Sequence, residues 1–99
     1  MYRGTTPTHV FTVGQDLSEA EVLYITYTQG KIVVEKTKSD CTITETTIEV
    51  TLTQAETLSF AKSRGAVQVQ IRARFADGKA VASNSMAVPV EDILKDGEI

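Results

Sequence analysis

Few side chains in this sequence of 99 residues could carry out covalent or acid–base chemistry. The only histidine is His9 and the only cysteine is Cys41. A cysteine nucleophile needs a neighbouring base that takes up its proton, and histidine is the usual base. Nothing in the sequence brings these two residues together. We therefore expect Cys41 to be a free, partly buried thiol, and His9 to lie on a sheet face in phase with Phe11 and Val13.

Known catalytic, phosphate-binding and metal-binding motifs are absent from the sequence. It has no G-x-S-x-G elbow and no G-x-x-x-x-G-K-[ST] loop, since Gly30-Lys31 and Gly78-Lys79 lie in predicted hairpin turns. A single cysteine excludes a disulfide framework and a multi-cysteine zinc site. Among 13 acidic residues, chance pairs of carboxylates are inevitable and do not indicate glycoside hydrolysis. We expect no catalytic residue, no metal and no cofactor, and we predict that the protein is not an enzyme.

Other side chains are suited to recognition. Between Val67 and Phe75, apolar and polar residues alternate without a break, so the polar set lines one face of a long strand. Two members of this set are arginines, which suit an acidic partner, although a solvated sheet face would have the same pattern. Tyr24 is the tyrosine that we expect to be exposed, whereas Tyr27 shares its phase with Ile25 and belongs to the core. The candidate interaction face comprises Gln68, Gln70, Arg72, Arg74 and Tyr24.

The elements that must position these side chains are mostly strands. Alternation and β-branched residues predict strands at residues 8–13, 22–29, 31–36, 41–44, 47–52, 67–75 and 80–90. The last of these lies at an edge near Pro89 and is bent at Ser83-Asn84-Ser85. Gln29-Gly30 and Asp77-Gly78 predict hairpin turns, the second of type I′. Single turns, helical or not, are expected at residues 16–21 and 92–95.

One short helix interrupts the strands. Thr53 and Glu56 have the spacing of a capping box, which predicts a helix over about residues 54–62 that Gly65 closes. The inward side chains would be Leu58 with Ala61, or else Phe60. The fold class is therefore all-β: an immunoglobulin-like antiparallel β-sandwich of six to seven strands, with this helix between the fifth and sixth strands. A small Greek-key barrel is the alternative.

Residues 1–99 form a single domain, with an N-terminal arm (residues 1–7) and an acidic C-terminal tail (residues 91–99). Both segments could order on a neighbouring subunit. The formal net charge of −3 argues against binding to nucleic acid or to an anionic lipid surface. No apolar run approaches the length of about 20 residues that spans a membrane. We expect a protein without its own export signal, in a reducing compartment.

Several stretches resemble small proteins encoded in prophages of Gram-positive bacteria. They are YRGTTPT at residues 2–8 with Phe11-Thr12 after it, LTQAETL at 52–58, VQIRAR at 69–74 and ILKDG at 93–97. Such proteins lie in the tail-module region and are similar to the N-terminal domain of the longer phage baseplate upper proteins, an immunoglobulin-like sandwich. The resemblance implies a phage structural or tail-associated role and transfers no functional residue. It also implies a location in the bacterial cytoplasm during assembly and in the virion tail afterwards.

The function that we expect is that of a non-catalytic assembly and interaction domain in a phage tail or baseplate. Its partners would be other tail or baseplate proteins, or further copies of the chain in a homo-oligomer. The acidic tail of a neighbouring copy is one candidate for the partner that binds Arg72 and Arg74. The alternative is a free-standing carbohydrate-binding module, which would need an exposed aromatic platform around Tyr24 or Tyr2.

Overall fold

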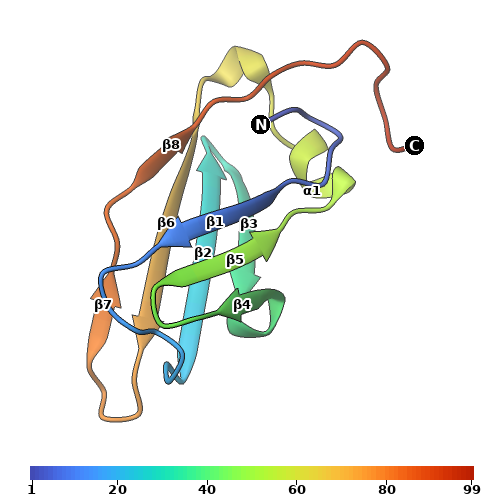
Figure 1. Ribbon diagram of the computed structural model, residues 1–99. Coiled ribbons are helices and arrows are strands. Elements are labelled where there is room, and N and C mark those ends of the chain that lie inside the picture. Colours follow the sequence, from blue (N-terminus) through green and yellow to red (C-terminus); the bar gives the residue numbers. More distant parts are fainter.

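Two antiparallel sheets pack face to face in the computed structural model, which describes residues 1–99 (Figure 1). The smaller sheet has the strand order β1 (Thr8–Thr12), β5 (Thr47–Thr51), β4 (Cys41–Ile43). The larger sheet has the order β3 (Ile32–Thr37), β2 (Val22–Gln29), β6 (Val67–Arg74), β7 (Ala80–Ala82). β8 (Met86–Val88) also pairs with β6, beyond the end of β7.

The order of the strands is that of an immunoglobulin domain. Such domains have sheets ABED and CFG, and a further strand C′ can join beside C. β1, β5 and β4 occupy the places of B, E and D, while β3, β2, β6 and β7 occupy those of C′, C, F and G. The short helix lies between β5 and β6. The predicted immunoglobulin-like sandwich is therefore confirmed, and the barrel alternative is wrong because the two sheets remain separate.

The long strand β6 forms the centre of the larger sheet, as the alternation predicts. Its burial alternates at every residue, with Val67, Val69, Ile71 and Ala73 inward. Fifteen buried apolar residues form one core between the two sheets, and Leu17 and Phe60 from the connecting segments are among them. Of the predicted inward residues of the helical segment, Phe60 is the one that is buried.

The predicted strand at residues 80–90 is wrong as a continuous element, because it breaks into β7 and β8. At Ser83 the backbone N–H donates to the carbonyl of Ile71 at 2.8 Å, but the hydroxyl Oγ accepts the N–H of Ile71 at 3.0 Å. The side chain thus takes the place of the backbone carbonyl in the ladder. The Ser83 carbonyl instead accepts from the Gln70 amide at 2.9 Å, and regular pairing resumes only at Met86. The structure consequently has eight strands instead of the six to seven predicted.

The helix is shorter than predicted. α1 spans Gln54–Leu58, and a separate 3₁₀ turn, η2 (Lys62–Arg64), follows it and ends at Gly65 with φ of 88°. The capping box is confirmed, with Thr53 N–H donating to Glu56 Oε1 at 2.8 Å and Glu56 N–H donating to Thr53 Oγ1 at 3.1 Å. Ala61 is extended because its N–H donates to the side chain of Gln29 at 2.8 Å instead of to a helical carbonyl.

The two hairpin turns form at the predicted places, but the second is not of type I′. That type needs positive φ at both central residues, and only Gly78 has it, at 87°. Gly78 N–H donates to the carbonyl of Phe75 at 2.9 Å, and Phe75 N–H donates to that of Lys79 at 2.8 Å, so the loop has three residues. The segments at residues 16–21 and 92–95 hold turns or bends and no helix.

The N-terminal arm lies against the chain's own body. Arg3 N–H donates to the carbonyl of Glu91 at 3.0 Å, and the Thr57 hydroxyl donates to the carbonyl of Thr5 at 2.9 Å. The guanidinium of Arg3 donates to the carbonyls of Phe60 at 2.7 Å and Leu58 at 3.1 Å. It also lies 3.4 Å from a carboxylate oxygen of each of two tail residues, Asp92 and Asp96. The arm and the acidic tail are therefore joined at one end of the sandwich, and the arm needs no neighbouring subunit to order it.

Candidate interaction surface

The structure brings all five predicted interaction residues to the outer face of the larger sheet. The antiparallel register of β2 and β6 places Tyr24 opposite Arg72, with Val22 opposite Arg74. Gln68 and Gln70 continue the row along β6, opposite Thr28 and Thr26. The row is exposed because its members alternate with the buried residues of β6.

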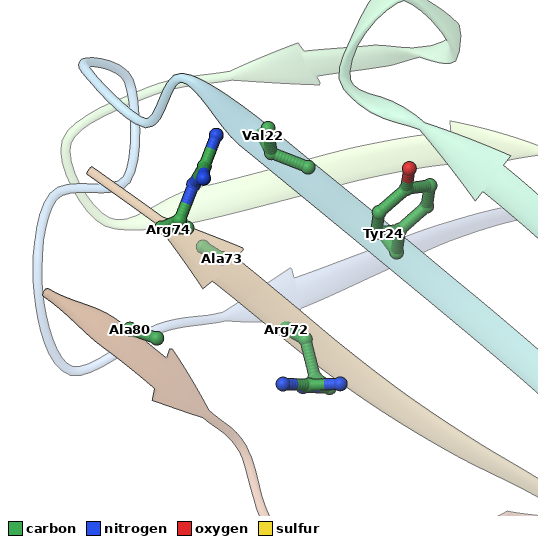
Figure 2. Close-up of a pocket in the computed structure, with 6 residues that line it drawn as sticks. All are labelled: Val22, Tyr24, Arg72, Ala73, Arg74 and Ala80. Carbon is green, nitrogen blue, oxygen red and sulfur yellow. The ribbon is translucent and has the colours of Figure 1, made fainter. Parts of the chain in front are cut away.

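A shallow hollow of about 360 Å³ lies at one end of this face (Figure 2). Its walls are Tyr24 and Val22 from β2 and the two arginines from β6, and the small side chain of Ala80 on β7 leaves the space open. Most of its lining is apolar, since four of its six lining residues are hydrophobic and the stems of arginine side chains are aliphatic. We call this region, with Val22, Tyr24, Arg72, Ala73, Arg74 and Ala80, the arginine hollow.

The two arginines differ in their surroundings. Arg74 lies 3.5 Å from the carboxylate of Glu21, and both side chains are about half exposed. The guanidinium of Arg72 has no ion pair and donates no hydrogen bond within the chain, and it is exposed beside Tyr24. A guanidinium presents five donors in a planar fork that suits a carboxylate, and its weak hydration favours contacts at interfaces. The hollow therefore offers a partner both the unpaired guanidinium of Arg72 and a largely apolar lining.

Tyr24 and Tyr2 do not form a common aromatic platform. Tyr24 is 40% exposed and lies opposite Arg72, near the end of β6. Tyr2 pairs with Glu91, which follows β8 in the chain. β8 lies beside the start of β6, where Val88 is opposite Val67. The two rings therefore lie toward opposite ends of the sheet, and each would have to act alone.

An ion pair that joins the larger sheet to the helix was not predicted from the sequence. Lys36 on β3 is only 9% exposed, and its Nζ lies 2.7 Å from Oε1 of Glu56 on α1. Burial opposes the ionisation of Glu56, but hydrogen bonds from Lys36 and Thr53 together hold the pKa of its carboxyl below its usual value. The signal was present in the sequence, because Lys36 shares the inward phase of Ile32 and Val34.

The residues that could act as a nucleophile and a base are kept apart. His9 on β1 and Cys41 on β4 lie opposite the same residue of β5, Val50, on its two sides. The strand β5 therefore separates them. Nδ1 of His9 is 2.7 Å from the hydroxyl of Tyr27, and burial lowers the pKa of the imidazole. The thiol of Cys41 donates to the carbonyl of Thr37 at 3.3 Å, and burial is the main cause that raises its pKa. Neither group is therefore activated by the other.

A second hollow, of about 350 Å³, opens where the edges of the two sheets approach each other. β1 contributes Phe11, while the larger sheet contributes Ile71, Val81 and Met86. Leu17 also lines it. This seam is largely apolar and carries no charged side chain.

None of the helices has the length and apolar character needed to cross a lipid bilayer. No group of three or more histidine, cysteine, aspartate or glutamate side chains is placed to hold a metal ion. Comparisons of the chain with protein-family models, with curated proteins and with solved structures find no match.

Proposed function

We propose that this chain is a non-catalytic assembly domain that binds other proteins through the outer face of its larger sheet. The observation that carries the proposal is the position of Arg72, which has no ion-pair partner beside the half-exposed ring of Tyr24 and an open hollow. Tyrosine and arginine are enriched in protein–protein interfaces and among the residues that dominate binding energy. An acidic surface with one protruding apolar side chain would complement this region.

The setting that we propose is the tail or baseplate of a bacteriophage. Its support is the resemblance of residues 2–8, 52–58, 69–74 and 93–97 to small prophage tail-module proteins. A sandwich with an open outer face suits a part that works by shape and by contact with neighbours. The partners would be tail or baseplate proteins, met in the bacterial cytoplasm during assembly.

The test uses phage particles from an induced lysogen that carries the gene. Mass spectrometry should find the protein in purified particles or in tail intermediates. The charge reversals Arg72→Glu and Arg74→Glu, made together in the full chain, should reduce its incorporation. A matched control is the pair Lys31→Glu and Arg64→Glu, which changes the net charge equally at exposed sites outside the hollow. Absence from particles and intermediates, with normal particles after gene deletion, would refute the proposal.

Carbohydrate binding is the second candidate, because Tyr24 is exposed beside a hollow that a sugar ring could enter. A glycan array with the wild-type chain and with Tyr24→Ala tests it. Binding that depends on Tyr24 would support this function, and an array without signal would remove it.

A further inference from the structure

The acidic tail and the arginine hollow lie at opposite ends of the molecule, whose longest extent is 47 Å (Figure 1). The tail starts beside the N-terminal arm, near the beginning of β6, where Glu91 also approaches Lys62 at 3.6 Å. The hollow is at the other end, where β2 begins and β6 ends. A tail therefore cannot reach the hollow of its own chain, but it can reach that of a second copy.

The tail is held by contacts that are easily exchanged. Its carboxylates at Asp92 and Asp96 are 3.4 Å from the Arg3 guanidinium and are mostly exposed to solvent. Exposed ion pairs of this kind contribute little to stability. Arg3 would keep its hydrogen bonds to two carbonyls if Asp96 moved away. At the tail end, two hydrogen bonds join the backbone of Ile99 to the side chain of Gln54, which is partly exposed to solvent.

The chemistry of the tail complements that of the hollow. Leu94 is fully exposed, at 108%, so a large apolar side chain has nothing to cover it. Asp96 and Glu98 are separated by one residue, as are Arg72 and Arg74 on β6. The residue between the two acids is Gly97, with φ of 86°, and glycine can adopt either this conformation or an extended one. Leu94 would enter the apolar floor beside Tyr24, while the two carboxylates approach the guanidiniums.

We propose that residues 93–99 of one copy dock in the arginine hollow of the next copy. The proposal rests on the proposed function, because it names a second copy of this chain as the partner of the candidate interaction face. Such a contact uses two different patches and is therefore heterologous, so that it builds closed rings or open filaments. Glu21, which lies 3.5 Å from Arg74, competes for one of the two arginines, and Arg72 is the principal contact.

Sedimentation velocity over a range of concentrations tests the proposal with the full-length chain. The wild type should sediment faster as its concentration rises, and added salt should oppose this change. Two variants each lose association: the hollow variant, Arg72→Glu with Arg74→Glu, and the tail variant, Asp96→Arg with Glu98→Arg. The control pair Lys31→Glu and Arg64→Glu should associate as the wild type does. Circular dichroism checks that every variant is folded.

Mixing the two variants gives the decisive result. The acidic hollow of the hollow variant matches the basic tail of the tail variant. The native acidic tail of the hollow variant likewise matches the native arginine hollow of the tail variant. Association should therefore return in the mixture, although each variant alone stays monomeric. A wild type that is monomeric at its highest soluble concentration would overturn the proposal, as would a tail variant that associates normally. Loss of phage incorporation in the hollow variant alone, with a normal tail variant, would retain the proposed function and reject the second copy as the partner.

Discussion

Lys36 Nζ lies 2.7 Å from Oε1 of Glu56, the residue that also closes the capping box of α1. One carboxylate thus begins the helix and neutralises a lysine that is almost fully buried on β3. This contact ties the segment between β5 and β6 to the edge strand of the larger sheet. It is the clearest place to test how the connecting segments stabilise the sandwich.

We expect Glu56→Gln to destabilise the protein by about 1–3 kcal/mol, because it leaves the Lys36 ammonium buried without its counter-ion. Lys36→Met should cost less, since it removes the buried charge itself. Urea denaturation of both single variants and of the double variant measures the coupling. Single effects that simply add in the double variant would contradict a direct interaction.

Stability should fall in acid, and Glu56 should supply part of the effect. Its pKa in the folded state is below the ordinary value of 4.5, so the unfolded chain binds a proton more readily. The stabilisation is therefore complete above that value and is lost as the pH falls through the lower, folded-state pKa. Asp16 and Asp40 have lowered pKa values as well, through hydrogen bonds from Ser18 and Thr37 respectively. Unfolding measured between neutral and acidic pH should depend less on pH in Glu56→Gln than in the wild type.

Gln29→Leu should cost about 3 kcal/mol or more, because a buried hub of hydrogen bonds would be lost. The Gln29 side chain is 3% exposed and donates to the carbonyls of Ala61 and Gly65, both at 2.7 Å, while it accepts from Ala61 N–H at 2.8 Å. Gln68→Leu, at an exposed position of β6, is the matched control and should change stability little. Thermal unfolding of the two variants compares them, and equal melting temperatures would contradict the role of Gln29.

Gly78→Ala should destabilise the β6–β7 hairpin by about 1 kcal/mol, since φ of 87° is unfavourable for a residue with a Cβ. Gly14→Ala is the control, because Gly14 has no positive φ. An added Cβ would meet open space at Gly14 and at Gly78 alike. Chemical denaturation should separate the two variants, with the Gly14 variant at least as stable as the wild type. Equal losses would show that backbone strain at Gly78 is not the cause.

The features that depend on one local segment were predictable, and those that depend on two segments far apart in sequence were not. Strict alternation identified β6, and the spacing of Thr53 and Glu56 identified the start of α1. The end of α1 was not predictable, because it depends on Gln29, which is distant in sequence. The break after β7 depends likewise on a serine hydroxyl that replaces a ladder carbonyl.

The same distinction holds for the candidate site. The outward position of the five candidate residues could be predicted, because parity along β2 and β6 decides which side chains point outward. The hollow could not, since it needs the pairing of β7 with β6 and the small side chain of Ala80. The ion pairing of Arg74 also depends on a residue outside the strands, Glu21, which approaches it only in the folded chain.

The contacts of Arg3 have a consequence for limited proteolysis. Its guanidinium donates to the carbonyls of Leu58, at the end of α1, and Phe60, and it pairs with two carboxylates of the tail. A protease that removed the first three residues would therefore also free Asp92 and Asp96 from these ion pairs, although the cut lies at the other end of the sequence. The freedom of the tail to meet other molecules thus depends in part on the opposite terminus of the same polypeptide.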